Sequence, residues 1–208
     1  TARGMILGIE TASPICSVGL AHEDRILAEI NFEVKNLHDR VLAETIQQLL
    51  RWCGMEFAQL HGIAISAGPG SFTGLRIGMG VAKGLAFAQD KPIVAVNTLL
   101  LQAAAAAPLA RAFALGRGME VSAVRIVPVL HSRRGEIYTA GYTWQAPLPA
   151  QEEQERVVAL SDFPAVLKGM TVLCGNGVAA LRETGALSQV ENILVVTGQE
   201  ARLSGGWA

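Results

Sequence analysis

Residues 66–83 constrain the fold more than any other part of this 208-residue chain. They read Ser-Ala-Gly-Pro-Gly-Ser-Phe-Thr-Gly-Leu-Arg-Ile-Gly-Met-Gly-Val-Ala-Lys, which is typical of a strand end, a tight loop and a helix. Residues four apart share one helical face, so Gly70, Gly74, Gly78 and Ala82 form a flat stripe. Each interior glycine lowers helix stability by roughly 1 kcal/mol relative to alanine, and close packing must offset that loss.

Two kinds of packing could offset that loss: a sheet on one side that is approached unusually closely, or a second helix on the other side with the two backbones nearly touching. A plain core helix against its own sheet would use bulky residues such as Ile77 and Val81 and would not need the glycines. Glycines four residues apart favour a close helix-helix approach instead. We therefore predict an isologous contact with another protein on this stripe. Replacement of Gly74 or Gly78 by leucine would then abolish pairing and leave the monomer folded.

The composition limits the partners and the compartment. The net charge is −1 and no lysine or arginine run occurs, so we expect no unaided binding to nucleic acid. Three cysteines without a C-x-x-C pair indicate reduced thiols in a cytoplasmic protein. The most apolar segment, 81–88, is far shorter than the roughly 20 residues of a membrane span. Residues 1–4 precede Met5 and are interpreted as an added segment, with no signal peptide.

The first half of the chain alternates strand and helix patterns. Three runs of branched residues, at 6–9, 15–21 and 26–32, predict an antiparallel meander. Further elements are expected as a helix at 36–53, a strand at 63–66, the glycine helix at 73–88, a strand at 92–96 and an alanine-rich helix from Asn97 that ends before Pro108. The predicted order is βββαβαβα. It is the ribonuclease-H-like layout of the actin, Hsp70 and sugar-kinase superfamily (the ASKHA fold), an α/β fold with a mixed sheet.

The second half is read as a smaller, degenerate lobe of the same kind. We place the first lobe at 5–108 and the second at 109–208, with 109–122 as the crossover between them. Strands at 124–130 and 137–143 bracket a hairpin, and 144–154 is predicted as an acidic loop that contains proline. A short helix capped by Ser161, a strand at 171–174 and a helix after 175–177 complete the lobe.

Four stretches resemble a known family. They are Ile-Leu-Gly-Ile-Glu-Thr-Ala-Ser from residue 6, Leu-His-Asp-Arg-Val-Leu from residue 37, residues 67–78 with Ala-Lys-Gly-Leu-Ala from residue 82, and Arg-Arg-Gly-Glu-Ile-Tyr from residue 133. On these motifs the chain is similar to the bacterial TsaB (YeaZ) family of tRNA threonylcarbamoyladenosine biosynthesis proteins. The resemblance extends to about residue 145, and the C-terminus departs from the basic tail of the family.

The resemblance implies a cytoplasmic scaffold subunit that does no chemistry itself. A related TsaD-type transferase attaches the threonylcarbamoyl group to the adenosine beside the tRNA anticodon, and a small TsaE-type ATPase joins the pair. The chain is expected to bind and activate the transferase, to form a homodimer in isolation, and to reach tRNA only indirectly through the complex. The expected interface comprises Leu37, His38, Arg40, Val41 and Glu44 on the first helix and Gly70, Phe72, Gly74, Leu75, Gly78, Met79 and Ala82 around the second.

The glycine loop also invites a phosphate interpretation, because a helix N-terminus attracts anions. Position 73 is threonine instead of the glycine of a dinucleotide fingerprint, and no Gly-Lys-Ser/Thr follows, so a turn with packing is favoured over nucleotide contact. The candidate nucleotide-binding residues are Thr11, Ser13, Gly68 and Gly70. Glu10 and Ala12 replace the aspartate and glycine of nucleotide-using relatives, which predicts a weakened site. No cofactor is expected to be obligatory, although ATP or ADP at the TsaD interface remains open.

Catalytic patterns are weak throughout. The histidines stand at 22, 38, 61 and 131 without metal-ligand spacing, and no Gly-x-Ser-x-Gly elbow occurs. The alternatives left open are a nucleotide-dependent kinase or ATPase of the same superfamily, which would turn over ATP, and a metal-dependent hydrolase, which would hold stoichiometric metal.

Overall fold

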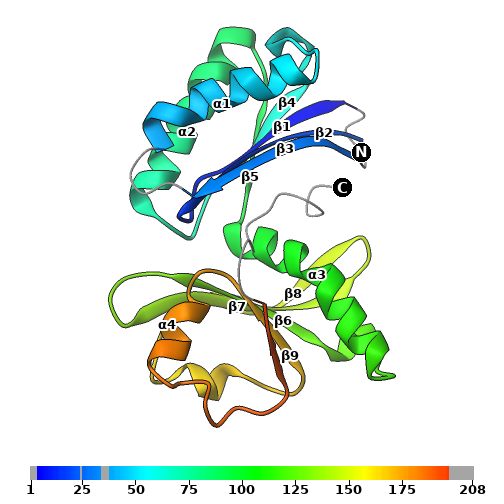
Figure 1. Cartoon of the computed structure of the whole chain (residues 1–208), viewed down its shortest axis with the longest axis vertical. Coiled ribbons are helices and arrows are strands. Elements are labelled where there is room, and N and C mark those ends of the chain that lie inside the picture. Colours follow the sequence, from blue (N-terminus) through cyan, green and yellow to red (C-terminus); the bar gives the residue numbers. More distant parts are fainter. Residues whose placement is uncertain (1–3, 24, 34–37, 197–208) are drawn as a thin grey trace. The chain divides into compact units, whose positions relative to one another are not determined.

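The chain divides into two compact units. The computed structural model describes residues 4–23, 25–33 and 38–196. The first unit extends to Thr98 and the second begins at Leu99. Each unit is built on its own five-stranded sheet, and the two sheets are drawn in Figure 1.

The first sheet is mixed and has the order β3-β2-β1-β4-β5. Its strands are β1 (Met5–Glu10), β2 (Ile15–His22), β3 (Arg25–Glu33), β4 (Gly62–Ser66) and β5 (Ile93–Val96). The first three pair antiparallel as a meander, whereas β4 lies parallel to β1 and β5 lies parallel to β4. Parallel neighbours place the ends of β1, β4 and β5 at one edge, where the glycine loop begins.

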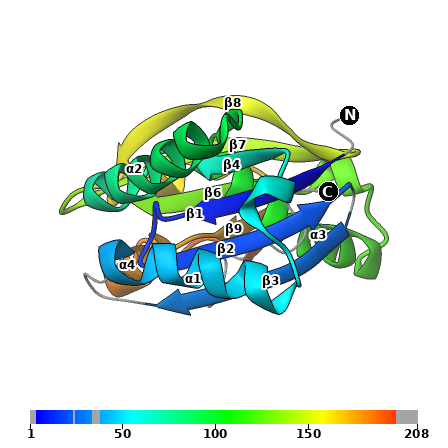
Figure 2. The same ribbon diagram turned by 90° about the horizontal axis from the view of Figure 1, so that it is seen from above.

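Two helices cover one face of this sheet. Helix α1 (His38–Trp52) and helix α2 (Phe72–Gln89) pack against each other, and Figure 2 shows them side by side. The apolar period of α1 buries Leu42, Ile46 and Leu49 in the core of the unit. Because the buried face of α2 consists of small residues, this helix approaches the sheet closely. That face comprises Gly74, Gly78, Ala82 and Ala86.

The second sheet repeats the layout of the first. Its strands are β6 (Arg125–His131), β7 (Glu136–Gln145), β8 (Leu148–Ala159), β9 (Thr171–Cys174) and β10 (Ile193–Val195), in the order β10-β9-β6-β7-β8. Three consecutive strands pair antiparallel, then β9 lies parallel to β6 and β10 parallel to β9. The two sheets thus share one topology, which is the ribonuclease-H-like arrangement expected for both lobes.

Helices in the second unit are distributed over both faces of its sheet. Helix α3 (Thr98–Gly116) packs a stripe of buried alanines on one face, and η3 (Phe163–Val166) with the short α4 (Val178–Glu183) packs on the other (Figure 1). Short 3₁₀ turns, η1 (Phe57–Gln59) and η2 (Val121–Ala123), precede β4 and β6. By length and composition α3 could cross a membrane, but half of its apolar stretch is buried in the unit, as in a core helix.

The predicted elements of the first unit are confirmed, whereas the predicted helix end before Pro108 and the predicted loop at 144–154 are wrong. Helix α3 does not end before Pro108 but continues through it to Gly116, so 109–122 is not a crossover. The units divide ten residues before the predicted boundary, since α3 packs with the second sheet. Residues 148–159 form the long strand β8 and not a loop. Asn36, the predicted helix start, lies outside the described residues.

Candidate functional site

The start of α2 is held against the β1–β2 turn of its own unit. The Ser71 N–H donates to the Ala12 carbonyl oxygen at 2.7 Å, and the Ser71 hydroxyl caps the helix by accepting from the Gly74 N–H at 3.2 Å. Gly68, with φ of +110°, makes the bend that leads from β4 into this cap. The glycine loop therefore docks the helix onto the turn between β1 and β2.

Gly70 in the loop before α2, and Gly74 and Gly78 within the helix, make room for this turn. A Cβ at Gly70 would lie closer than 3.0 Å to the Ala12 carbonyl oxygen, and one at Gly74 equally close to the Thr11 carbonyl oxygen. A Cβ at Gly78 would meet the Thr11 hydroxyl. The explanation offered for Gly74 and Gly78 from sequence is therefore wrong, because their face is occupied by their own unit and not by another protein. Leucine at either position would disrupt the fold itself.

A second pair of glycines lies on the opposite side of α2. If Gly80 or Gly84 carried a Cβ, it would meet no atom of the described residues within 4 Å apart from its chain neighbours and the backbone of its own helix. Phe87, one turn on, is 92% exposed and Phe72, at the helix start, is 68% exposed. We call this face, from Phe72 through Gly80 and Gly84 to Phe87, the outer face of α2.

A groove of about 430 Å³ runs along the beginning of the outer face. Its lining residues are Ser66, Ala67, Phe72, Leu75, Arg76, Met79, Gly80 and Lys83. The Arg76 guanidinium lies 3.8 Å from the centre of the Phe72 ring, a cation-π contact that holds both side chains at the rim. Exposed aromatic rings beside an open backbone surface are typical of protein interaction sites.

The predicted interface residues separate into two groups. Phe72, Leu75 and Met79 line the groove, whereas Gly74, Gly78 and Ala82 are buried inside the unit. On α1, Val41 is half-buried and Glu44 is exposed. Leu37 lies outside the described residues, and His38 and Arg40 are described only as parts of the α1 backbone. Whether these helices form an interface stays a prediction.

Sequence reasoning missed the outer face. Gly80, Gly84 and Phe87 were not among the predicted contact residues. Their signal was present in the chain, since Gly80 and Gly84 are also four residues apart and Lys83 and Phe87 fall on the same side. The inner stripe has the same spacing but extends over more positions, from Gly70 to Ala82, and it was therefore chosen.

The candidate nucleotide-binding residues already serve the fold. Thr11 and Ser13 are buried, and the Ser13 hydroxyl bonds both the N–H and the carbonyl of Ile15 at 3.2 Å. The Gly68 N–H donates to the Thr98 hydroxyl at 3.1 Å, and the Thr98 N–H returns a bond to the Gly68 carbonyl at 2.8 Å. A phosphate group would have to displace these bonds to use the same donors.

Glu10 is the most perturbed acid at this edge of the sheet. Burial raises its pKa from 4.5 to about 7, against the opposing effect of hydrogen bonds from the Ala12 N–H and the Ser66 hydroxyl. Its second oxygen, Oε2, has no hydrogen-bond partner among the described residues. Burial also raises the pKa of the nearby Cys16 thiol to about 12, with a contribution from Glu10, so this thiol is not an activated nucleophile.

Metal-ligating side chains do not converge in the described part of the chain. No group of three or more His, Cys, Asp or Glu residues among residues 4–23, 25–33 and 38–196 could hold a metal ion. His61, for example, accepts a hydrogen bond from the Met5 N–H through Nδ1 at 3.0 Å and so serves the start of β1.

Comparison with known proteins identifies relatives over most of the chain. The family model described as "TsaD: tRNA N6-adenosine threonylcarbamoyltransferase" matches residues 26–201. The tRNA threonylcarbamoyladenosine biosynthesis protein TsaB of Bacillus subtilis is 33% identical over 163 residues, covering 78% of this chain and 66% of that protein. TsaB of Escherichia coli is 33% identical over 66% of this chain and 54% of its own length. The chain thus spans between about half and two thirds of these relatives.

Solved structures agree with the sequence relatives. YeaZ from Pseudomonas aeruginosa superposes with a TM-score of 0.71 at 28% identity, over 86% of this chain and 79% of that one. Component A of the (R)-2-hydroxyglutaryl-CoA dehydratase of Acidaminococcus fermentans reaches 0.51 at 10% identity over 98% and 96% of the two chains, a likeness of fold alone. The shared topology of both sheets, the matched family model and these relatives together show that the chain belongs to the TsaD family, on its TsaB (YeaZ) branch.

Proposed function

We propose that this chain is a non-catalytic subunit required for threonylcarbamoyladenosine modification of tRNA. In this role it binds a TsaD-type transferase and, together with a TsaE-type ATPase, holds the transferase in its active conformation. The names of the TsaB relatives support the pathway, and the matching of a TsaD family model supports kinship with the transferase itself. Activation of this kind requires only that the chain bind the active conformation of its partner more tightly than the inactive one.

The outer face of α2 is the observation that carries the proposal. It joins two exposed phenyl rings, Phe72 and Phe87, to an open backbone surface at Gly80 and Gly84. A partner helix can approach the backbone of α2 closely at Gly80 and Gly84, because neither glycine carries a side chain. Aromatic anchors of this type dominate the energy of protein interfaces.

The proposed lack of catalysis is supported by the state of the β1–β2 turn. The donors that a phosphate would use, such as the Gly68 and Ser71 N–H groups, are bonded within the unit. In this proposal ATP or ADP acts only at the interface with the transferase, tRNA is reached through the complex, and the assembly is cytoplasmic. A second copy of the chain occupies the same outer face when the transferase is absent, which makes the homodimer a competitor of the complex.

Reconstitution tests the proposal. The cognate TsaD-type and TsaE-type proteins are mixed with tRNA, ATP and the threonylcarbamoyl donor, with the chain present or omitted, and modified adenosine is quantified by mass spectrometry. We expect modification to depend on the chain, and the chain alone to give none. Modification at full rate without it would overturn the proposal.

Variants of the outer face locate the interface. Phe87→Ser removes the most exposed ring of the face, and Leu115→Ser on α3, at an exposed apolar position of the second unit, is the matched control. We expect Phe87→Ser to weaken binding to the transferase by at least about tenfold, because it removes an aromatic anchor. A tenfold change corresponds to a loss of roughly 1.4 kcal/mol of binding free energy. Leu115→Ser should bind like wild type in calorimetric titration. Equal effects of both substitutions would place the interface elsewhere.

A further inference from the structure

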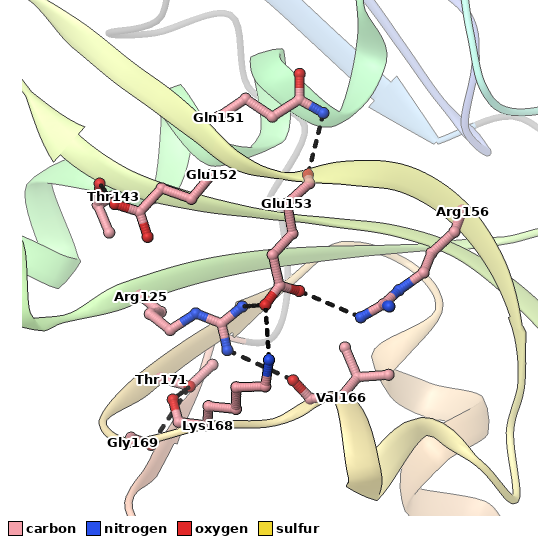
Figure 3. Close-up of polar contacts among 10 residues, drawn as sticks. All are labelled: Arg125, Thr143, Gln151, Glu152, Glu153, Arg156, Val166, Lys168, Gly169 and Thr171. Carbon is pink, nitrogen blue, oxygen red and sulfur yellow. Dashed lines mark hydrogen bonds and ion pairs between the residues drawn. The ribbon is translucent and has the colours of Figure 1, made fainter.

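A charge cluster in the second unit lies far along the chain from the groove on α2. Glu153 of β8 lies 2.9 Å from the Arg125 guanidinium of β6, 3.2 Å from that of Arg156 on β8, and 3.4 Å from the Lys168 ammonium on the loop before β9. Figure 3 shows the three cations converging on this one carboxylate from different elements.

The sheet is deformed to build this cluster. Arg125 and Glu153 belong to strands separated by β7, and they meet across Gly141. A Cβ at Gly141 would lie 2.7 Å from Arg125 Nη2 and 3.2 Å from Glu153 Cβ, so a side chain here would displace the Arg125 guanidinium from its present position. The pairing of β7 with β8 shifts register on both sides of Gly141, which turns Glu153 toward Arg125.

The cluster holds more positive charge and more donors than its acceptors can use. Three cations face one carboxylate, which leaves an excess of two positive charges. Arg125 Nη1 donates to the Val166 carbonyl at 3.4 Å, but Nη2, although close to Glu153, has no aligned hydrogen-bond acceptor among the described residues. Attraction by the three cations holds the pKa of Glu153 below its usual value despite partial burial, so its charge is constant near neutral pH.

The excess charge is directed to solvent. The Arg125 side chain is 13% exposed, whereas Arg156 is 48% and Lys168 is 71% exposed. The neighbouring acid Glu152 points away from the cluster in Figure 3 and accepts from the Thr143 hydroxyl at 2.9 Å. Glu155 lies near Tyr142, on the α3 side of the sheet. A single ion pair would have satisfied Glu153, and two further cations add repulsion that an incoming anion relieves.

We propose that Arg156 and Lys168, positioned by the Arg125–Glu153 pair, form a binding site for a phosphate group. Arginine and lysine N–H groups are the usual ligands of phosphate oxygens. Inorganic phosphate or a phosphate monoester, with up to two negative charges, matches the excess of two positive charges, whereas an RNA backbone supplies one negative charge per phosphodiester. The phosphate belongs either to a free phosphate compound or to the backbone of an RNA. Glu153 acts as an internal competitor that keeps the two cations in place when the site is empty. This proposal stands independently of the proposed function.

Titration of the full chain with inorganic phosphate and, separately, with a short single-stranded RNA tests the site, using backbone amide NMR shifts as the readout. We expect both probes to shift resonances around residues 153–156 and 168. Lys168→Ala and Arg156→Ala should each weaken binding by about fivefold to tenfold, whereas Arg182→Ala, an exposed arginine of α4, should not. Thermal unfolding by circular dichroism checks that the variants fold.

Glu153→Gln separates binding from a structural role. If the carboxylate competes with the ligand, its neutralisation tightens phosphate binding severalfold even where it lowers stability. Tighter binding of RNA than of phosphate, with a log-log salt slope that falls by about 0.7 for each lost contact, identifies a polynucleotide ligand. If the affinity for RNA, expressed per phosphate group, equals the affinity for inorganic phosphate, the ligand of the site is a small phosphate compound. Absence of localised shifts with either probe, or equal effects of Lys168→Ala and Arg182→Ala, overturns the proposal.

Discussion

Substituting alanine at two glycines of one helix should change stability in opposite directions. Gly74→Ala, in the first turn of α2, and Gly80→Ala, in its interior, introduce the same methyl group, and each gains helix propensity of up to about 1 kcal/mol. At Gly80 the methyl group meets no atom of the described residues within 4 Å apart from its chain neighbours and the backbone of α2 itself. We therefore expect Gly80→Ala to raise the free energy of unfolding by about 1 kcal/mol.

At Gly74 the same methyl group meets backbone. It would lie closer than 3.0 Å to the Thr11 carbonyl oxygen, which cannot rotate away as a side chain would. Relief requires the β1–β2 turn to move, and that movement stretches the 2.7 Å bond from the Ser71 N–H to the Ala12 carbonyl. Overpacking of this kind costs about 3 kcal/mol at the upper end of its range, so the net loss is about 2 kcal/mol and the two variants differ by about 3.

Urea unfolding followed by far-ultraviolet circular dichroism measures both variants, at low protein concentration and against wild type. A mutation that changes the midpoint but not the slope has changed stability. If Gly74→Ala were as stable as Gly80→Ala, the inner stripe would not be packed against the β1–β2 turn, and the explanation of the glycines would have to return to an external partner.

Three further results are expected. Burial raises the pKa of Glu10 from 4.5 to about 7, so between these pH values the folded state keeps a proton that the unfolded state loses. The contribution of Glu10 to the free energy of unfolding is therefore greatest below pH 4.5 and falls by about 3 kcal/mol as the pH rises to 7. Urea unfolding at several pH values should show a smaller pH dependence for Glu10→Gln than for wild type. Gly175→Ala, where φ is +99° and a Cβ meets the Val129 carbonyl oxygen, should lower the midpoint of thermal unfolding more than Gly141→Ala, where it meets side-chain atoms of Arg125 and Glu153. Calorimetric titration of the isolated chain with ATP and magnesium should show no micromolar binding and no hydrolysis; turnover would favour a nucleotide-dependent enzyme instead.

Local patterns were sufficient to predict the first unit. Local sequence alone predicts these elements, without information from distant residues. The runs of branched residues predict the three strands of the meander, the apolar period predicts α1, and the glycine-proline loop predicts the start of α2. The antiparallel and parallel pairings follow from the order of those elements, because consecutive strands without a helix pair as hairpins and strands separated by a helix pair in parallel.

Tertiary packing overrode local signals in the second unit. Pro108 predicts a helix end, but α3 continues through it because buried alanines on both sides pack against the second sheet. The segment that became β8 is rich in Glu and Gln and contains a proline, a composition that disfavours strands. It pairs along the whole of β7 because the Arg125–Glu153 contact and the shifts around Gly141 hold an edge strand that local propensity does not.

The two glycine pairs of α2 show what spacing alone leaves undetermined. Gly74 with Gly78 and Gly80 with Gly84 have the same four-residue interval, and the interval says only that each pair presents one flat face. Which face turns inward depends on the β1–β2 turn, about sixty residues earlier in the chain, whose Thr11 carbonyl and hydroxyl fill the space that Gly74 and Gly78 leave. The docking hypothesis drawn from glycine spacing therefore applies to the other pair. A partner helix that exploits missing side chains on α2 has to meet Gly80 and Gly84, between Phe72 and Phe87, since that is where the missing side chains leave open surface.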